Sequence, residues 1–216
     1  MLLLALDTAT PAVTVALHDG SAVIAELSAV DPRRHGEVLA VFVDQALRKA
    51  GAGRADLTAI AVGTGPGPYT GLRAGVVTAR VLGSALQIRT DGFCSLDVIA
   101  AQASAGAEGS DFLVATDARR REVYWARYTA DGQRVAGPSV SRPADIPADL
   151  PVAGEGGLLY PELSARPLAP LYPSAGQLAC IAVGRISAGL PPELAEPMYL
   201  RRPDAREPGK PKRVTP

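Results

Sequence analysis

The start of the chain decides the fold: residues 2–27 read LLLALDTATPAVTVALHDGSAVIAEL. Short polar turns separate three apolar runs of strand length there, which cover residues 2–6, 13–17 and 23–27. The second turn contains Asp19-Gly20, a pair that favours a tight hairpin. We therefore predict three strands joined in an antiparallel meander, with Asp7 at the end of the first strand.

The segments that follow alternate between helix and strand patterns. Apolar residues recur every three to four positions over residues 36–50, which predicts an amphipathic helix. Residues 57–62 predict a short buried strand, and the glycine-proline loop over residues 63–68 leads into a second helix, about 69–86. This alternation is typical of an α/β fold.

The pattern partly restarts after a small, polar stretch at residues 103–110. Residues 112–115 predict a strand that leads to Asp117, much as the first strand leads to Asp7. Beyond residue 137 prolines are dense and the periodicity fades, except for a helix around residues 176–187. We therefore divide the chain into an N-terminal lobe, 1–105, and a smaller C-terminal lobe, 106–216, with a basic, flexible tail from about residue 203.

Charge and composition limit the functions that the chain can have by itself. It has 216 residues, with 22 Lys and Arg against 22 Asp and Glu, so its formal net charge is zero. A protein that binds tRNA unaided usually has a strong basic excess. Here that excess is confined to the C-terminal tail, which is either a solvated end or a nucleic-acid contact. No apolar run is long enough for a secretory signal or a membrane span, so we expect a cytoplasmic protein.

Two segments are candidates for binding an anion. Asp7 and Thr8 follow the first strand, where an acidic residue can hold Mg²⁺ and phosphate, although a structural turn is the simpler interpretation. Gly65 and Gly67 precede a helix start, and Arg73 lies in its first turns. The loop lacks the lysine of a P-loop, and its two prolines remove backbone donors, so we favour a rigid structural elbow there.

The helix that follows this loop has a stripe of minimal side chains at a spacing of four, formed by Gly71, Gly75, Ala79 and Gly83. Such a stripe lets another backbone approach closely. It can rest on the protein's own sheet or first helix, or on a partner's helix. In the partner case Gly75→Leu would weaken a complex and leave the monomer folded.

The sequence contains no pattern of a nucleophile with its base. The two histidines, His18 and His35, are too far apart for a metal-binding pair on one helix. The run Arg119-Arg120-Arg121 can meet phosphate, but at a turn such a run is more often a solvated face. We therefore predict no catalytic residue and no metal site.

Four motifs together resemble one known family, and they span residues 2–201, nearly the whole chain. They read LALDTAT (4–10), GPGPYTGLR (65–73), DAR…EVYW (117–125) and AEPMYLR (195–201). They are similar to those of the TsaB (YeaZ) family. The resemblance implies an actin-like ASKHA (ribonuclease H-like) α/β fold with two lobes, the second degenerate.

The resemblance also implies a function. It implies a scaffolding, non-catalytic subunit of the complex that makes N6-threonylcarbamoyladenosine at position 37 of tRNAs reading ANN codons. The catalytic partner would be TsaD, with the ATPase TsaE joining, tRNA bound only by the whole complex, and a homodimer forming in isolation. No cofactor would be tightly bound, although ADP or ATP can lie at the TsaD interface. The alternative is a stand-alone ASKHA-type ATPase or phosphotransferase that uses Asp7.

Carried over by position, the partner-binding residues lie on the two helices of the first lobe. They are Val38, Phe42, Gly71, Leu72, Gly75, Val76, Ala79, Arg80 and Gly83. The weaker candidates for nucleotide or anion contact are Asp7, Thr8, Gly65, Gly67 and Arg73.

Overall fold

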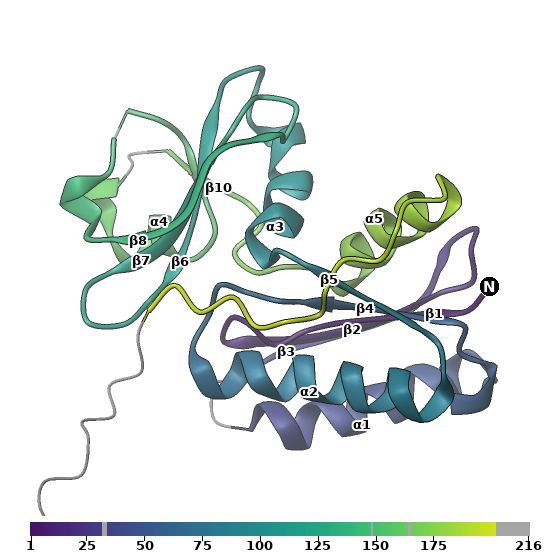
Figure 1. Cartoon of the computed structure of the whole chain (residues 1–216). Coiled ribbons are helices and arrows are strands. Elements are labelled where there is room, and N and C mark those ends of the chain that lie inside the picture. Colours follow the sequence, from purple (N-terminus) through teal and green to yellow (C-terminus); the bar gives the residue numbers. More distant parts are fainter. Residues whose placement is uncertain (32–33, 148, 164–165, 202–216) are drawn as a thin grey trace, which may run out of the picture.

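The computed structural model describes residues 1–31, 34–147, 149–163 and 166–201, and it shows two lobes that each contain a five-stranded sheet (Figure 1). The predicted tail from about residue 203 lies outside the described residues. The first sheet contains β1 (Leu3–Asp7), β2 (Ala12–His18), β3 (Val23–Val30), β4 (Ala59–Gly63) and β5 (Arg89–Phe93). The second contains β6 (Phe112–Asp117), β7 (Val123–Tyr128), β8 (Arg134–Ser141), β9 (Val152–Ala153) and β10 (Pro167–Leu168). The helices are α1 (His35–Lys49), α2 (Tyr69–Leu86), α3 (Ser95–Ala103), α4 (Gly156–Leu159) and α5 (Ala175–Ser187).

The first sheet has the strand order β3-β2-β1-β4-β5. Its strands β1, β2 and β3 pair antiparallel, with Leu3 opposite His18 and Val13 opposite Ala29, so the predicted meander is confirmed. Strands β4 and β5 continue the sheet in parallel from β1. The central strands β1, β2 and β4 are buried along their whole length, as expected for strands with helices on both faces.

The second sheet repeats this topology, with the order β10-β9-β6-β7-β8. Strand β6 pairs antiparallel with β7 and parallel with β9, as β1 does with β2 and β4. Strands β9 and β10 are reduced to two residues each. Two lobes of one topology, the second shortened, confirm the expected actin-like α/β class with a degenerate second lobe.

Strand β8 was not predicted, because its sequence contains Pro138 and lies where the periodicity fades. The structure places β8 at the edge of the second sheet, where β7 is its one neighbour among the described strands. A proline is tolerated there because an edge strand does not need every backbone donor.

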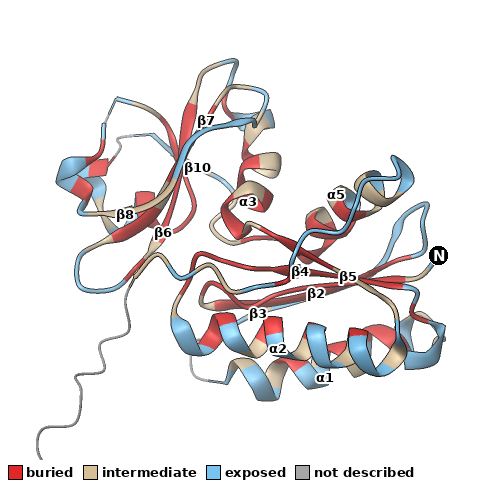
Figure 2. Cartoon of the chain, in the orientation of Figure 1, coloured by how far each residue is buried: buried red, intermediate tan, exposed pale blue. Residues whose placement is uncertain are grey.

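Helices cover both faces of the first sheet (Figures 1 and 2). Leu4 and Leu6 point to the side of α1 and α2, while Leu3 and Ala5 share a cluster with Leu178 of α5, as the alternation of a strand requires. The last part of the predicted second lobe is therefore wrongly assigned, because α5 belongs to the first lobe. No helix in the described ranges combines the length and apolar character needed to cross a bilayer.

After α5 the chain runs back along the first sheet. Gly92 donates its N–H to the carbonyl of Glu193 (3.0 Å), and Met198 donates to the carbonyl of Thr64 (2.8 Å). The segment 191–201 therefore lies between the first sheet and the second lobe, and its last described residue, Arg201, reaches the second lobe.

Candidate functional site

The stripe of small residues on α2 faces this chain's own sheet, which is the first of the two alternatives. Gly75 shows the reason: a Cβ added there would lie 2.5 Å from Oγ1 of Thr8 and 3.3 Å from Cδ1 of Leu6. The buried members of the predicted partner surface are Gly71, Leu72, Gly75, Val76, Ala79 and Gly83. Their role in a partner contact stays a prediction, since Val76 also lines a groove on the surface of α2, whereas Gly75→Leu would disrupt the monomer.

Thr8 explains the close approach between β1 and α2. Its hydroxyl donates to the carbonyl of Gly71 (2.7 Å) and accepts the N–H of Gly75 (2.9 Å). In a regular α-helix the N–H of Gly75 would donate to the carbonyl of Gly71, four residues earlier. The Thr8 hydroxyl bonds to both groups and is therefore inserted into the backbone hydrogen-bond pattern of α2. Thr8 is almost fully buried, and its polar atom is used to hold the helix.

Asp7 is also committed to the fold. Its side chain is fully buried, Oδ1 accepts the N–H of Ala9 (2.7 Å), and Oδ2 accepts the hydroxyl of Ser95 (2.6 Å). Burial raises the pKa of Asp7 to about 6, while the Ser95 and Ala9 hydrogen bonds oppose that rise. In this conformation both oxygens of Asp7 are inaccessible, so its assignment as a nucleotide or anion contact stays a prediction that the geometry does not favour.

The glycine-proline loop packs tightly on the turn after β1. Gly67 is buried, and an added Cβ would overlap the backbone of Ala9, while Gly65 adopts a positive φ of 90°. The loop therefore acts as the rigid elbow that we favoured, and Gly65 and Gly67 are not exposed for an anion. Of the weaker candidates, only Arg73 is exposed.

The exposed surface of the first lobe carries an aromatic and cationic cluster formed by Tyr69, Arg73 and Tyr199. The two tyrosine rings stack with centroids 5.2 Å apart, and the guanidinium of Arg73 lies 3.9 Å from the Tyr69 centroid. Beside it, Val77 and Val81 are 55% and 61% exposed. The cluster and the valines border a groove of about 430 Å³, which is the strongest candidate site for a partner.

The other predicted partner residues are Arg80 of α2 and two residues of α1. Arg80 is exposed and lines the same groove. Val38 and Phe42 of α1 are half-buried and pack against the first core, while Val41 is 50% exposed on the same helix.

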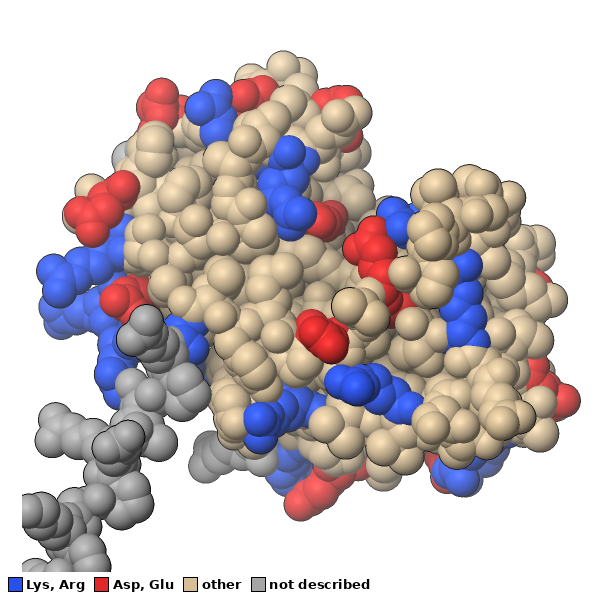
Figure 3. All heavy atoms as spheres, in the orientation of Figure 1, with Lys and Arg blue, Asp and Glu red and all other residues tan. Residues whose placement is uncertain are grey.

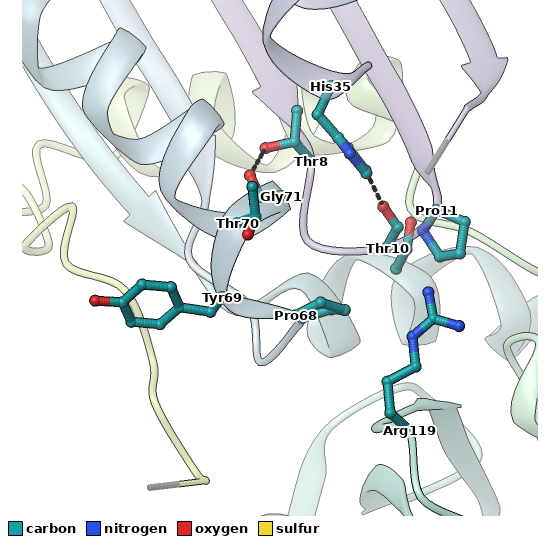
Figure 4. Close-up of a pocket in the computed structure, with 9 residues that line it drawn as sticks. All are labelled: Thr8, Thr10, Pro11, His35, Pro68, Tyr69, Thr70, Gly71 and Arg119. Atoms are coloured by element: carbon teal, nitrogen blue, oxygen red, sulfur yellow. Dashed lines mark hydrogen bonds between the residues drawn. The ribbon is translucent and has the colours of Figure 1, made fainter. Parts of the chain in front are cut away.

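A second hollow, of about 220 Å³, lies between the lobes (Figure 4). Thr10 and His35 line it from the first lobe, and Nε2 of His35 lies 2.9 Å from the carbonyl oxygen of Thr10. Arg119 reaches toward it from the second lobe and forms an ion pair with Asp117 (3.1 Å). Within the described part of the chain, no group of three or more His, Cys, Asp or Glu side chains is placed to hold a metal ion.

Comparisons with known proteins agree with this architecture. A family model described as TsaD, tRNA N6-adenosine threonylcarbamoyltransferase, matches residues 23–160. The Escherichia coli tRNA threonylcarbamoyladenosine biosynthesis protein TsaB is 32% identical over 220 residues, covering 93% of this chain and 95% of that protein. The chain belongs to the TsaB (YeaZ) family.

Other relatives of this TsaB-family chain cover nearly its whole length. The uncharacterized protein Rv3421c of Mycobacterium tuberculosis is 46% identical over 207 residues, covering 94% of this chain and 93% of that protein. The solved structure of YeaZ from Pseudomonas aeruginosa is 32% identical, with a TM-score of 0.75, and the match covers 92% of this chain and 99% of that one.

Sequence reasoning missed Val77, Val81 and Tyr199 of this TsaB-family chain. The valines carried a usable signal, because they lie on the helix face opposite the small residues that pack on the sheet. No sequence pattern pointed to Tyr199, because its position beside α2 depends on the return of the segment 191–201 along the first sheet.

Proposed function

We propose that this chain is a scaffolding, non-catalytic subunit of the complex that makes N6-threonylcarbamoyladenosine in tRNA. It binds and activates a TsaD subunit, which carries out the transfer at position 37 of tRNAs that read codons beginning with A, and the ATPase TsaE joins them. Membership of the TsaB family supports this proposal, as does the name of the Escherichia coli relative, a tRNA threonylcarbamoyladenosine biosynthesis protein.

The observation that carries the proposal is the outer face of α2. Its inner face is filled by the chain's own sheet, so the exposure of Val77 and Val81 serves no packing within the monomer. Exposed apolar side chains next to tyrosines and an arginine have the composition of an interface centre, where such residues contribute most of the binding energy. We assign this face to TsaD, and to a second copy of this chain when TsaD is absent.

The burial of Asp7 supports a non-catalytic role. A phosphotransferase that used Asp7 would need its carboxylate to reach Mg²⁺, yet both oxygens are held by Ala9 and Ser95 inside the first lobe. The structure therefore gives the alternative, a stand-alone ATPase, no support. Any ADP or ATP belongs, in this proposal, to the interface with TsaD, and none is bound tightly by this chain alone.

The test uses two acidic substitutions on the exposed face. Val77→Asp combined with Val81→Asp should reduce capture of this chain by tagged TsaD by at least about 10-fold, because charges would be buried without partners. Val135→Asp is the matched control, since Val135 is also 55% exposed but lies on β8 of the second lobe. Undiminished capture of the double variant would contradict the assignment. Transfer by this chain without any other protein would overturn the non-catalytic role.

A further inference from the structure

The turn between β6 and β7 displays three consecutive arginines in an unusual backbone conformation. Arg119, Arg120 and Arg121 have φ values of 64°, 54° and 59°. L-residues rarely adopt this left-handed region, and they do so singly more often than in series. Such a conformation persists only where the surrounding structure holds it, and it is frequent at functional sites.

Several bonds hold this arginine turn (residues 119–121). The N–H of Ala118 donates to the carbonyl of Glu122 (2.9 Å), and the N–H of Glu122 donates to the carbonyl of Arg119 (3.0 Å). The guanidinium of Arg201 contacts the residues on either side of the turn: it donates to the carbonyl of Ala118 (2.8 Å) and forms an ion pair with the carboxylate of Glu122 (3.1 Å). The arginines are therefore presented by a fixed backbone.

The arginine turn borders a groove of about 660 Å³ on the second lobe, and Figure 3 shows Lys and Arg side chains at one edge of that lobe with acidic side chains next to them. Arg121 and Arg142 line the groove, are exposed, and form no ion pair with another described residue. Tyr160 adds an aromatic ring to the lining, and Glu162 is the acidic residue among the lining side chains.

We propose that this groove binds the phosphate backbone of RNA through Arg121 and Arg142. The guanidinium group donates in a planar fork that fits phosphate oxygens, and two exposed arginines on one open groove suit an extended polyanion. That the RNA is tRNA rests on the proposed function. Because the net charge of the chain is zero, the groove contributes a local contact within the complex.

The experiment measures binding of fluorescein-labelled tRNA to the purified complex of the full chain with TsaD, by anisotropy, from 50 to 200 mM KCl. Arg121→Gln combined with Arg142→Gln should weaken binding by about 10-fold at 50 mM and reduce the slope of log K against log[KCl] by about 1.5 to 2. Glu162→Gln should tighten binding by about 2-fold, because it removes an opposing charge. The matched control is Arg48→Gln with Lys49→Gln, which removes two exposed charges from α1 and should change binding by less than about 2-fold.

Each outcome bears on the proposal. Absence of binding by the complex that contains the unmodified chain, equal loss in the two double variants, or an unchanged salt slope would overturn it. Competition by tripolyphosphate as effective, molecule for molecule, as that by tRNA would show a small polyphosphate site and overturn the assignment to RNA. Capture by TsaD should not change in the Arg121 and Arg142 variant, so failure of this inference and failure of the proposed function are separate results.

Discussion

Arg73 donates a hydrogen bond from Nε to the hydroxyl of Tyr199 at 2.8 Å, although the two residues are 126 positions apart. The same guanidinium lies over the ring of Tyr69, which stacks on Tyr199. The returning segment 191–201 and the start of α2 therefore build one surface. The proposed partner face depends on both segments, and substitutions in either one should affect it.

Tyr199→Ala should weaken binding to TsaD by about 5- to 10-fold, because it removes both the ring and the acceptor that orient Arg73. Tyr199→Phe keeps the stacked ring and should cost only about 2-fold, which makes it the matched control. Titration calorimetry with purified TsaD measures both values. Equal effects of the two substitutions would show that the hydrogen bond alone matters, and no effect would exclude Tyr199 from the interface.

Gly75→Ala should reduce the free energy of unfolding of the monomer by about 1–3 kcal/mol, because the new methyl group would push against Thr8 and the helix backbone that Thr8 bridges. Gly184→Ala is the control: Gly184 lies inside α5 with nothing within 4 Å of an added Cβ. It should increase the free energy of unfolding by about 0.5–1 kcal/mol, as alanine favours a helix over glycine. Urea unfolding measures both, and a neutral Gly75→Ala would contradict the tight contact.

Asp7→Asn should change the pH dependence of stability. The pKa of Asp7 is about 6 in the folded protein against 3.8 as its ordinary value, so the folded state holds more protons between these values. The contribution of the protonated side chain is therefore complete below about pH 4 and is lost as the pH rises through 6. From pH 4 to pH 7 the difference in unfolding free energy should shift in favour of the Asn variant, by on the order of 3 kcal/mol.

Thermal or urea unfolding of both proteins across this pH range provides the measurement. Ser95→Ala serves as a second variant: it removes a hydrogen bond to the ionised carboxylate, and its cost should be larger at pH 7 than at pH 4. A difference between wild type and Asp7→Asn that does not vary with pH would show that Asp7 is not buried as described.

Arg121→Gly should increase the free energy of unfolding by about 1 kcal/mol, because glycine adopts a positive φ without steric cost. The same variant should bind tRNA more weakly, since it lacks the guanidinium. Stability and RNA binding would then change in opposite directions, as expected where a strained residue is retained for function. Arg121→Gln separates the two effects, because it removes the charge and keeps the strain. A loss of stability in Arg121→Gly would argue against the left-handed conformation.

The patterns that the sequence identified well are local ones. Alternating apolar runs with Asp19-Gly20 between them predicted the antiparallel meander, and the 3.6-residue period predicted α1 and α2. These features were readable because pairing across a short turn and burial of one helix face are fixed by neighbours in the chain. The edge strand β8 was missed since its proline masks the pattern.

The sequence by itself determined that this chain has the TsaB-family fold, and it marked the small-residue stripe as a place of close backbone approach. Only the tertiary structure decided what lies against the stripe: it is Thr8, in the turn directly after β1. The stripe therefore faces the sheet, and the exposed Val77 and Val81 face away from it. It also brought Tyr199 to Arg73 and Arg142 to the arginine turn. The physical reason is that spacing fixes the relative direction of side chains within one element, while burial depends on which distant segments pack against it.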